Sequence, residues 1–271
     1  MQRNFSQLFN RALRTVIDNR LTVGLYEKTL WRQIKDGPKP EHIGVILDGN
    51  RRWASEHSYP LWFGHEFGAD KVEDLLEWCW ELGIKSVTLY VFSTENFDRA
   101  PSEVKQIMRI AEERFRKILK DERIHKKKVR VTAIGRLDRL PKGLQKLIQK
   151  TEKATEKYGN FYLNLAIAYG GRAEIVDAVK KIVAEIKNGD IPYTAIDEEI
   201  IEKHLYTSHL PKSDPDLIIR TSGEERLSNF LLWQSAYSEL HFLDVFWPDF
   251  RRIDLWRAIR IYQSRRRRYG R

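Results

Sequence analysis

The chain has 271 residues, of which 42% are apolar, so it is long enough for one large α/β domain or two small ones with a sizeable core. Its single cysteine, Cys79, excludes a framework of internal disulfides and a cysteine metal cluster, and is consistent with an intracellular protein. No apolar run approaches the roughly 20 residues that span a bilayer, the N-terminus lacks the features of a signal peptide, and the net charge of +10 is concentrated at the two ends of the chain.

The first predicted element is an amphipathic helix over residues 4–20, within an N-terminal extension that we assign to residues 1–36. Apolar side chains fall on one face of this helix, and the extension carries seven basic residues against three acidic ones. Two placements fit this pattern: packing on its own domain, or lying on a membrane surface, which the basic flanks favour. We therefore expect a cytoplasmic protein whose membrane contact, if any, is peripheral.

A short apolar run over residues 43–47 has the length of a buried strand. It leads into Asp48-Gly-Asn-Arg-Arg52, a turn signal with one carboxylate and two guanidiniums. Arginine binds phosphate through two hydrogen bonds and aspartate can hold Mg²⁺, so this turn suits a phosphorylated ligand with a bound cation. The alternative is an ordinary strand-to-turn junction with solvated arginines.

Beyond this turn, strand-like apolar runs alternate with helical patterns. We predict further strands over residues 86–92, 129–134, 161–167, 216–220 and 240–242. We predict helices over residues 67–82, 102–126, 142–157, 172–187 and 253–266. Strands that alternate with helices indicate a mainly parallel sheet covered on both faces. Because no internal repeat or low-complexity linker divides the chain, we predict a single α/β domain.

Polar side chains follow several of these strands, at the point where each strand ends. They include Asp48 to Arg52 after the first strand, Ser93 to Arg99 after the second, Tyr169 to Arg172 after the fourth, and Arg220 to Gly223 after the fifth. In parallel sheets of this kind, ligands bind at the carboxyl ends of the strands. Arginines, hydroxyls and glycines at one edge suit a diphosphate, and the sequence has no P-loop or GxGxxG motif to bind it instead.

Several long motifs occur in the order that is typical of one enzyme family. They are His42-Ile-Gly-Val-Ile-Leu-Asp-Gly-Asn-Arg-Arg-Trp53, Phe63-Gly-His-Glu-Phe-Gly68, Thr88-Leu-Tyr-Val-Phe-Ser-Thr-Glu-Asn-Phe97, Asn164 to Arg172, Asp216 to Gln234, Tyr237-Ser-Glu239 and Phe246-Trp-Pro-Asp-Phe250. In these motifs the sequence resembles the cis-prenyltransferases, the undecaprenyl diphosphate synthase family. Arg51 and Leu61 stand where bacterial members usually have glycine and arginine. The Asp-Gly-Asn-Arg-Arg form, the N-terminal helix and the Gly135-Arg136 turn look more like archaeal or eukaryotic members.

The resemblance implies a catalytic domain over residues 40–250 that condenses isopentenyl diphosphate with an allylic prenyl diphosphate. Repetition of this step builds a long polyprenyl diphosphate with cis double bonds, a carrier lipid for sugars. The primer would be farnesyl or geranylgeranyl diphosphate, and the archaeal-like features favour the longer. The implied fold is a mostly parallel six-stranded sheet flanked by helices, which enclose a hydrophobic tunnel lined by the 102–126 helix.

The resemblance also implies roles for single residues. Asp48 matches the catalytic aspartate that works with Mg²⁺, and Glu239 matches a second carboxylate near the metal, which the partner subunit can supply. The allylic diphosphate loop matches Gly49, Asn50, Arg51, Arg52 and His65, with Trp53 at the start of the substrate-lining wall. The isopentenyl diphosphate site matches Arg220, Arg226, Leu227 and Ser228.

A mobile loop of the family matches the segment after the second strand: Ser93, Thr94, Glu95, Asn96, Phe97 and Arg99. In the family, Asn96 corresponds to a catalytic residue with a part in proton removal. A neutral amide is a poor general base, so we interpret Asn96 as an orienting group. The proton acceptor is then a diphosphate oxygen or a group polarised by His65.

The C-terminal segment, residues 251–271, carries nine arginines against one acidic residue and includes Arg268-Tyr-Gly270. The resemblance implies a homodimer in which this Arg-x-Gly signature reaches the neighbour's isopentenyl diphosphate. A disordered basic tail, or one on anionic lipid, is the alternative.

Two other functions fit parts of the sequence. One is a catalytically silent homologue that acts as a binding or regulatory subunit, although the chain retains the matched aspartate, arginines and histidine. The other is a nucleic-acid-binding protein with a basic tail. The net basic charge lies mainly at the chain ends and does not line one groove, so we expect no nucleic-acid partner.

Overall fold

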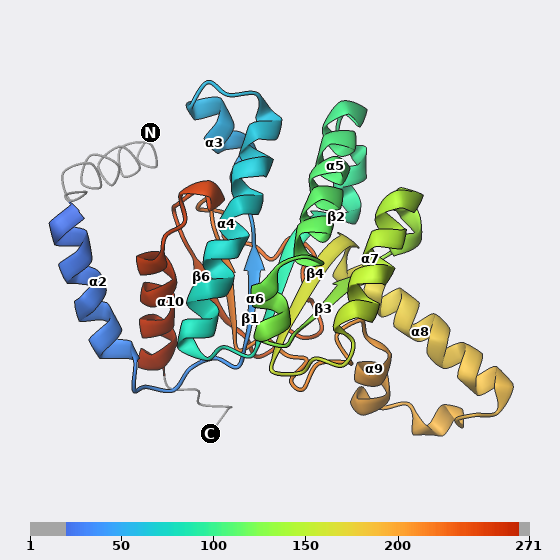
Figure 1. The fold of residues 1–271 in the computed structure, drawn as a ribbon. Helices are drawn as coiled ribbons and strands as arrows, with labels where there is room; N and C mark the ends of the chain where they lie inside the picture. Colours follow the sequence, from blue (N-terminus) through green and yellow to red (C-terminus); the bar gives the residue numbers. More distant parts are fainter. Residues whose placement is uncertain (1–19, 266–271) are drawn as a thin grey trace.

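The computed structural model describes residues 20–265, and at its centre lies a six-stranded sheet (Figure 1). The strands are β1 (His42–Ile46), β2 (Ser86–Ser93), β3 (Val129–Ile134), β4 (Phe161–Tyr169), β5 (Leu217–Arg220) and β6 (Glu239–Phe242). Their order is β3-β4-β2-β1-β5-β6, and every neighbouring pair is parallel. The predicted parallel sheet is confirmed, and each predicted strand lies within two residues of an observed one.

Alternate side chains of the central strands face two separate cores. On β1, Ile43 and Val45 belong to the larger core, whereas Ile46 belongs to the smaller core on the opposite face. Phe230, in the loop after β5, belongs to the smaller core and lies so close to Gly44 that a Cβ there would be 3.0 Å from its ring. Because both faces are covered, all of β1 is buried.

Helices complete the larger core. They are α2 (Arg20–Ile34), α4 (Leu61–Leu82), α5 (Pro101–Ile118), α6 (Glu122–Lys126), α7 (Lys142–Thr155) and α10 (Arg252–Ser264). The remaining helices are α3 (Asn50–Glu56), α8 (Gly171–Asn188), α9 (Glu198–His204) and the short 3₁₀ turns η1 (Thr94–Asp98), η2 (Leu137–Arg139), η3 (Tyr193–Ala195) and η4 (Trp247–Asp249). Cys79, on α4, is buried, as its apolar surroundings predict.

The prediction of one continuous helix over residues 102–126 is wrong, because the structure has two helices there. α5 ends at Ile118, and α6 begins at Glu122. The cause is Asp121, whose side chain accepts a hydrogen bond from the backbone N–H of Arg123 and caps a new helix. No glycine or proline marks the break. The seven-residue helices α3 and α9 were also not predicted, since they are too short to show a helical period.

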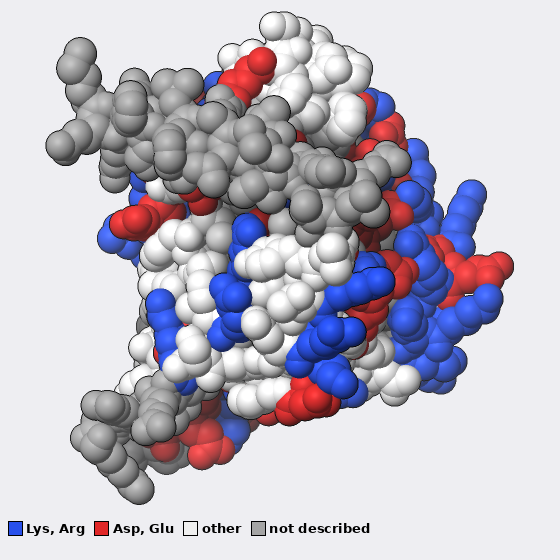
Figure 2. Space-filling model, turned by 90° about the vertical axis from the view of Figure 1, so that its left-hand side faces the viewer, with Lys and Arg blue, Asp and Glu red and all other residues white. Residues whose placement is uncertain are grey.

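The two ends of the described chain pack together. α2 lies along α10, with the ring centroids of Trp31 and Trp256 5.3 Å apart, and the side-chain amide of Gln263 donates to the carbonyl of Ile34 at 3.0 Å. Figure 2 views the molecule from this side. The predicted 4–20 helix lies outside the described residues. Between residues 20 and 265, no helix is both long and apolar enough to cross a membrane.

His42, the first residue of β1, makes folding sensitive to acid. Its ring is buried, with Nε2 2.8 Å from Thr88 Oγ1, and burial lowers its pKa from 6.5 to about 4, although Asp216 acts in the opposite direction. The unfolded chain takes up this proton near pH 6.5 and the folded chain does not, so stability is lost as the pH falls from 6.5 towards 4. We expect this group to lower the free energy of unfolding by about 2 kcal/mol between about pH 7.5 and 5.

Urea unfolding at both pH values measures this effect, with His42→Gln as the comparison. The variant should lose less stability on acidification. Equal losses in the two proteins would show that His42 is not the responsible group.

Candidate active site

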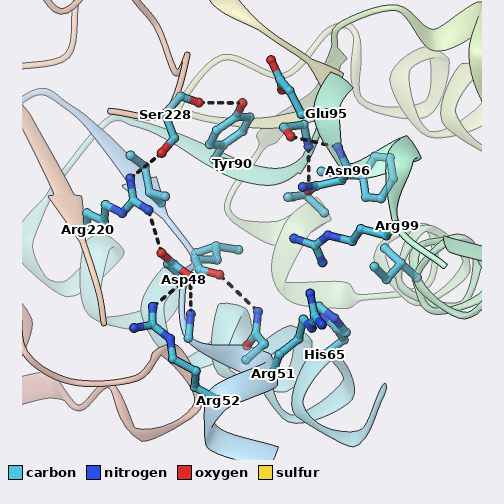
Figure 3. A pocket seen from close by; sticks show the side chains of 18 of the residues that line it. Asp48, Arg51, Arg52, His65, Tyr90, Glu95, Asn96, Arg99, Arg220 and Ser228 are labelled. Carbon is cyan, nitrogen blue, oxygen red and sulfur yellow. Dashed lines mark hydrogen bonds and ion pairs between the residues drawn. The ribbon is translucent and has the colours of Figure 1, made fainter. Parts of the chain in front are cut away.

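The topology opens a crevice where β1 and β5 end. From β1 the chain crosses through α3 and α4 to β2 on one side, whereas from β5 it continues to β6 on the other. Neighbouring parallel strands whose connections diverge leave a ligand crevice at their carboxyl ends. A pocket of about 860 Å³ lies there (Figure 3). It gathers these predicted residues: Asp48, Gly49, Asn50, Arg51, Arg52, His65, Ser93, Glu95, Asn96, Arg99, Arg220, Arg226 and Ser228.

Asp48 and Arg220 join the two sides of the crevice. Nη2 of Arg220, at the end of β5, donates to Oδ2 of Asp48 at 2.7 Å. The Arg220 side chain is only 4% exposed, and its Nη1 donates to Ser228 Oγ at 2.7 Å and to the carbonyl of Arg226. Burial raises the pKa of Asp48, but the hydrogen bond and charge of Arg220 outweigh it and hold this pKa below its ordinary value. The crevice thus contains an ionised carboxylate beside a fixed guanidinium.

The turn after Asp48 directs a second cation into the crevice. It depends on Gly49, whose φ of +103° lies in the left-handed region and whose N–H donates to Asp48 Oδ1 at 2.7 Å. α3 begins at the next residue, and Arg52 reaches back from it (Figure 3). Nη2 of Arg52 donates to Ser222 Oγ at 2.5 Å and lies 3.6 Å from Asp48 Oδ1. Arg52 therefore links the loops after β1 and β5.

Gly49→Ala should destabilise the protein by about 3 kcal/mol, because it combines an unfavourable φ with a clash. A Cβ at Gly49 would lie 2.7 Å from the Phe246 ring. Gly83→Ala is the matched control, since Gly83 has a φ of +74° but no atom within 4 Å of a built Cβ. Urea unfolding should show a smaller loss for Gly83→Ala, and equal losses would rule out the clash with Phe246.

Three further basic side chains surround one carboxylate on the opposite side of the pocket. Oε1 of Glu103, in the first turn of α5, lies 2.9 Å from Arg99 Nη1, 3.5 Å from His65 Nε2 and 3.7 Å from Arg51 Nε. Burial lowers the pKa of His65, and the charge of Arg99 lowers it further. Sequence reasoning missed Glu103, because an acidic residue in the first turn of a helix is common without any functional role.

The loop after β2 is fixed by reciprocal hydrogen bonds. The backbone N–H of Asn96 donates to Ser93 Oγ at 3.2 Å, and the backbone N–H of Ser93 donates to Asn96 Oδ1 at 3.0 Å. The side-chain oxygen of Asn96 therefore stabilises the conformation of the loop. Tyr90, which sequence reasoning also missed, lines the pocket from β2, and its hydroxyl donates to the carbonyl of Ser228 at 3.1 Å. A tyrosine within an apolar strand gives no sign of such a position.

Among the described residues, five predicted site residues do not line the pocket: Trp53, Thr94, Phe97, Leu227 and Glu239. Nε1 of the buried Trp53 donates to Asp249 at 2.8 Å, and Phe97 packs edge-on against Phe92 with ring centroids 4.9 Å apart. Leu227 packs against the smaller core, and Thr94 Oγ1 donates to Glu95 at 3.0 Å. In α3 and η1 the helical turn carries neighbouring side chains to different faces, so adjacency in the sequence did not place them all in the crevice.

Glu239 lies at the amino-terminal ends of the strands, whereas Asp48 lies just after the carboxyl end of β1. Glu239 begins β6 and is paired in register with Leu217 at the start of β5, and its side chain forms an ion pair with Arg265. The expectation that Glu239 and Asp48 share one metal therefore fails within a single protomer. Arg268 and Gly270 lie outside the described residues.

An apolar cavity of about 150 Å³ adjoins the polar pocket. Leu47, Asn50, His65, Val91 and Ile107 line both spaces. The cavity continues between α4, α5 and the sheet, and α5 contributes Ile110, Ala111, Phe115 and Ile118. This is where the family resemblance implies a hydrophobic tunnel lined by the 102–126 helix. The two spaces together suit a ligand with an anionic head and an apolar tail.

The donor set fits a magnesium ion that is bound together with a ligand. Asp48 offers a carboxylate that is 30% exposed in the pocket. Among residues 20–265, no group of three or more His, Cys, Asp or Glu side chains could hold a metal ion. Mg²⁺ is often held by one or two carboxylates plus water and phosphate oxygens, so Asp48 with a diphosphate is a suitable site.

Comparisons with known proteins agree with this geometry. The family model described as putative undecaprenyl diphosphate synthase matches residues 46–270. The tritrans,polycis-undecaprenyl-diphosphate synthase (geranylgeranyl-diphosphate specific) of Methanopyrus kandleri is 54% identical over 247 residues, which cover 91% of this chain and 90% of the relative. The protein of the same name from Methanocaldococcus jannaschii is 53% identical over 254 residues, which cover 94% of this chain and 91% of the relative.

Two solved structures share the fold. Lavandulyl diphosphate synthase from Lavandula x intermedia, in complex with dimethylallyl diphosphate, has a TM-score of 0.83 and 37% identity, covering 86% of this chain and 99% of that one. A probable undecaprenyl diphosphate synthase from Campylobacter jejuni has a TM-score of 0.70 and 31% identity, covering 86% of this chain and all of that one. Together with the cationic pocket and its apolar extension, these matches place the chain in the undecaprenyl diphosphate synthase family, as a cis-prenyltransferase that makes polyprenyl diphosphates.

Proposed function

We propose that the enzyme extends geranylgeranyl diphosphate with isopentenyl diphosphate to a long-chain polyprenyl diphosphate, a carrier lipid for sugars. The observation that carries this proposal is the junction of a cationic pocket with an apolar cavity, which suits a diphosphate with a growing isoprenoid tail. The names of the archaeal relatives state geranylgeranyl specificity, and this favours that primer over farnesyl diphosphate.

Two groups of cations suit two diphosphates. We assign the allylic diphosphate to the side of α3 and α4, where Arg51, Arg52 and His65 lie with Asn50. We assign isopentenyl diphosphate to the side of β5, where Arg220 and Arg226 lie with Ser228. Guanidinium groups can donate two parallel hydrogen bonds to phosphate oxygens, so each wall can orient its substrate. Binding both in one pocket brings the reacting carbons together.

In the condensation, a carbon–carbon bond forms between C1 of the allylic substrate and the terminal methylene carbon of isopentenyl diphosphate. The allylic diphosphate leaves with its bonding electron pair, and isopentenyl diphosphate loses a proton. Asp48 would hold Mg²⁺ with diphosphate oxygens, and the ion would neutralise charge on the leaving group. We assign the proton acceptor to a diphosphate oxygen, because the side-chain oxygen of Asn96 already accepts a hydrogen bond from the backbone N–H of Ser93.

We also propose that the active form is a homodimer that contacts membranes peripherally. Glu239 and the Arg268-Tyr-Gly270 signature would then serve the neighbour's site. The position of Glu239 at the end of the sheet away from Asp48 supports this, since it cannot act beside Asp48 of the same chain. A membrane surface would accept the long apolar product.

Deletion of residues 268–271 should raise the KM for isopentenyl diphosphate by about tenfold, equal to roughly 1.4 kcal/mol of lost binding, with no change in melting temperature. Steady-state kinetics and thermal unfolding of the truncated chain measure both quantities. Unchanged kinetics would favour a lipid-contacting or disordered tail.

The primer assignment is tested by competition. Purified protein, Mg²⁺ and radiolabelled isopentenyl diphosphate are mixed with farnesyl and geranylgeranyl diphosphate, each alone and then together, and the products are sized by chromatography. We expect a higher kcat/KM with geranylgeranyl diphosphate and long-chain products. Equal or better use of farnesyl diphosphate would refute the primer assignment while leaving the condensation itself intact.

A further inference from the structure

A row of ion pairs joins α4 to α5 and α6 on the outer side of the apolar cavity. The acidic partners are all on α4, and their spacing of four, three and four residues places them on one helical face: Glu66, Asp70, Glu73 and Glu77. The basic partners are all on α5 or α6: Arg109, Arg114, Lys117 and Arg123. We call these eight residues the ion-pair seam. In Figure 2, Lys and Arg side chains are interleaved with Asp and Glu along the right-hand margin.

The seam is continuous along the helices. Arg109 Nη2 lies 2.8 Å from Glu66 Oε1, and Arg114 Nη1 lies 2.7 Å from Asp70 Oδ1. Arg123, on α6, lies 3.2 Å from Glu77 Oε1.

Glu73 is the centre of the seam. Its carboxylate lies 3.7 Å from Arg114 and 2.9 Å from Arg123, and it accepts a hydrogen bond from Lys117. Burial raises the pKa of Glu73, but the hydrogen bonds from Lys117 and Arg123 outweigh it and keep this pKa below its ordinary value. The Glu73 carboxylate is therefore ionised at neutral pH.

Half of the ion-pair seam forms part of the wall of the apolar cavity. Glu73, Arg114, Lys117 and Arg123 line the cavity together with apolar side chains of α4, α5 and the sheet. The polar pocket meets the cavity near His65 and the first half of α5, whereas Lys117 and Arg123 lie near the end of α5 and on α6. A tail that grows from the pocket therefore advances along the seam.

The cavity must widen to hold a long product. Its volume of about 150 Å³ is below the roughly 300–1,000 Å³ of sites for small organic ligands. One wall is the sheet, whose strands are joined by backbone hydrogen bonds. The other wall is α4 and α5, which apolar side-chain packing and ion pairs hold together, so separation of these helices is the less costly way to widen the cavity.

We propose that the ion-pair seam limits the length of the polyprenyl product, because each added isoprene unit forces α4 and α5 further apart. This inference rests on the proposed chain-building function. Product growth stops when the seam resists further separation, so a weaker seam gives a longer product. The seam acts on the tail of the product and has no contact with the reacting carbons.

Glu73→Gln is the test, because it keeps the shape of the side chain and removes the charge that contacts three cations. Glu112→Gln is a matched control: Glu112 is 27% exposed, compared with 28% for Glu73, and it pairs with Arg116 on the same helix, outside the cavity lining. Products are sized after equal incorporation of isopentenyl diphosphate. We expect the main product of Glu73→Gln to be longer by at least one isoprene unit, and that of Glu112→Gln to be unchanged.

Further outcomes are decisive in other ways. If Glu73→Gln fails to fold by thermal unfolding, the double variant Glu66→Gln and Glu77→Gln takes its place with the same expectation. Normal incorporation with unchanged product length, or equal lengthening in the Glu112→Gln control, would overturn the role of the seam. Either result would leave the proposed chain-building function intact. If the unmodified enzyme forms no elongated product from any primer, the proposed function fails, and the seam proposal fails with it.

Discussion

Replacement of Asp48 by asparagine should lower kcat/KM for the condensation by about 10³-fold, equivalent to roughly 4 kcal/mol of transition-state stabilisation. Asparagine keeps the size of the side chain, but its single oxygen can accept from either Arg220 or the Gly49 N–H, because these donors bond to different oxygens of Asp48. It loses the negative charge that Mg²⁺ requires from this wall of the pocket. Initial rates of isopentenyl incorporation at varied substrate concentration measure the loss.

Asp48→Ala should be at least as impaired. Thermal unfolding of both variants is the necessary control, because removal of the carboxylate leaves the buried Arg220 with only its bonds to Ser228 and Arg226. Near-full activity of folded Asp48→Asn would disprove the catalytic assignment.

Arg220→Gln should lower kcat/KM by about 10²-fold, chiefly through a higher KM for isopentenyl diphosphate. Arg220 orders the crevice from a buried position, since one nitrogen donates to Asp48 and the other to Ser228 and Arg226. Arg220→Lys should recover little activity, because an ammonium cannot reproduce the planar fork.

The same variant should change the pH dependence of the reaction. Arg220 holds the pKa of Asp48 below its ordinary value against the opposing effect of burial, so without Arg220 this pKa rises. Because catalysis needs the ionised carboxylate, activity on acidification should be lost at a higher pH in Arg220→Gln than in the unmodified enzyme. Superimposable acid limbs in the two pH profiles would contradict the electrostatic coupling of Asp48 and Arg220.

The sheet and the centre of the site could be predicted from the sequence because buried parallel strands leave clear signals. Such strands appear as continuous apolar runs that end at turn residues, as at residues 43–47. Carboxyl ends of parallel strands share one edge, so Asp48 and Arg220 were expected together although 172 residues separate them. The distance of 2.7 Å between them confirms that reasoning.

Side-chain direction and assembly were harder to predict. Arg52 and Trp53 are neighbours in α3, yet Arg52 bonds to Ser222 over the crevice and Trp53 bonds to Asp249 away from it. Glu103 was missed because its surroundings depend on three basic side chains from other elements. The family resemblance implies that Glu239 lies near a metal when two subunits assemble. In the single chain, Glu239 lies at the start of β6, at the end of the sheet away from Asp48.

A magnesium titration of chain elongation by the unmodified protein tests whether the pocket at Asp48 carries out metal-dependent condensation. Purified enzyme is stripped with EDTA and then supplied with geranylgeranyl diphosphate, radiolabelled isopentenyl diphosphate and increasing Mg²⁺, and the products are extracted and sized. We expect no incorporation without the ion and, once it is added, formation of a long polyprenyl diphosphate with cis double bonds. Failure to form any elongated product with geranylgeranyl or farnesyl diphosphate at any Mg²⁺ concentration would contradict this role of the pocket.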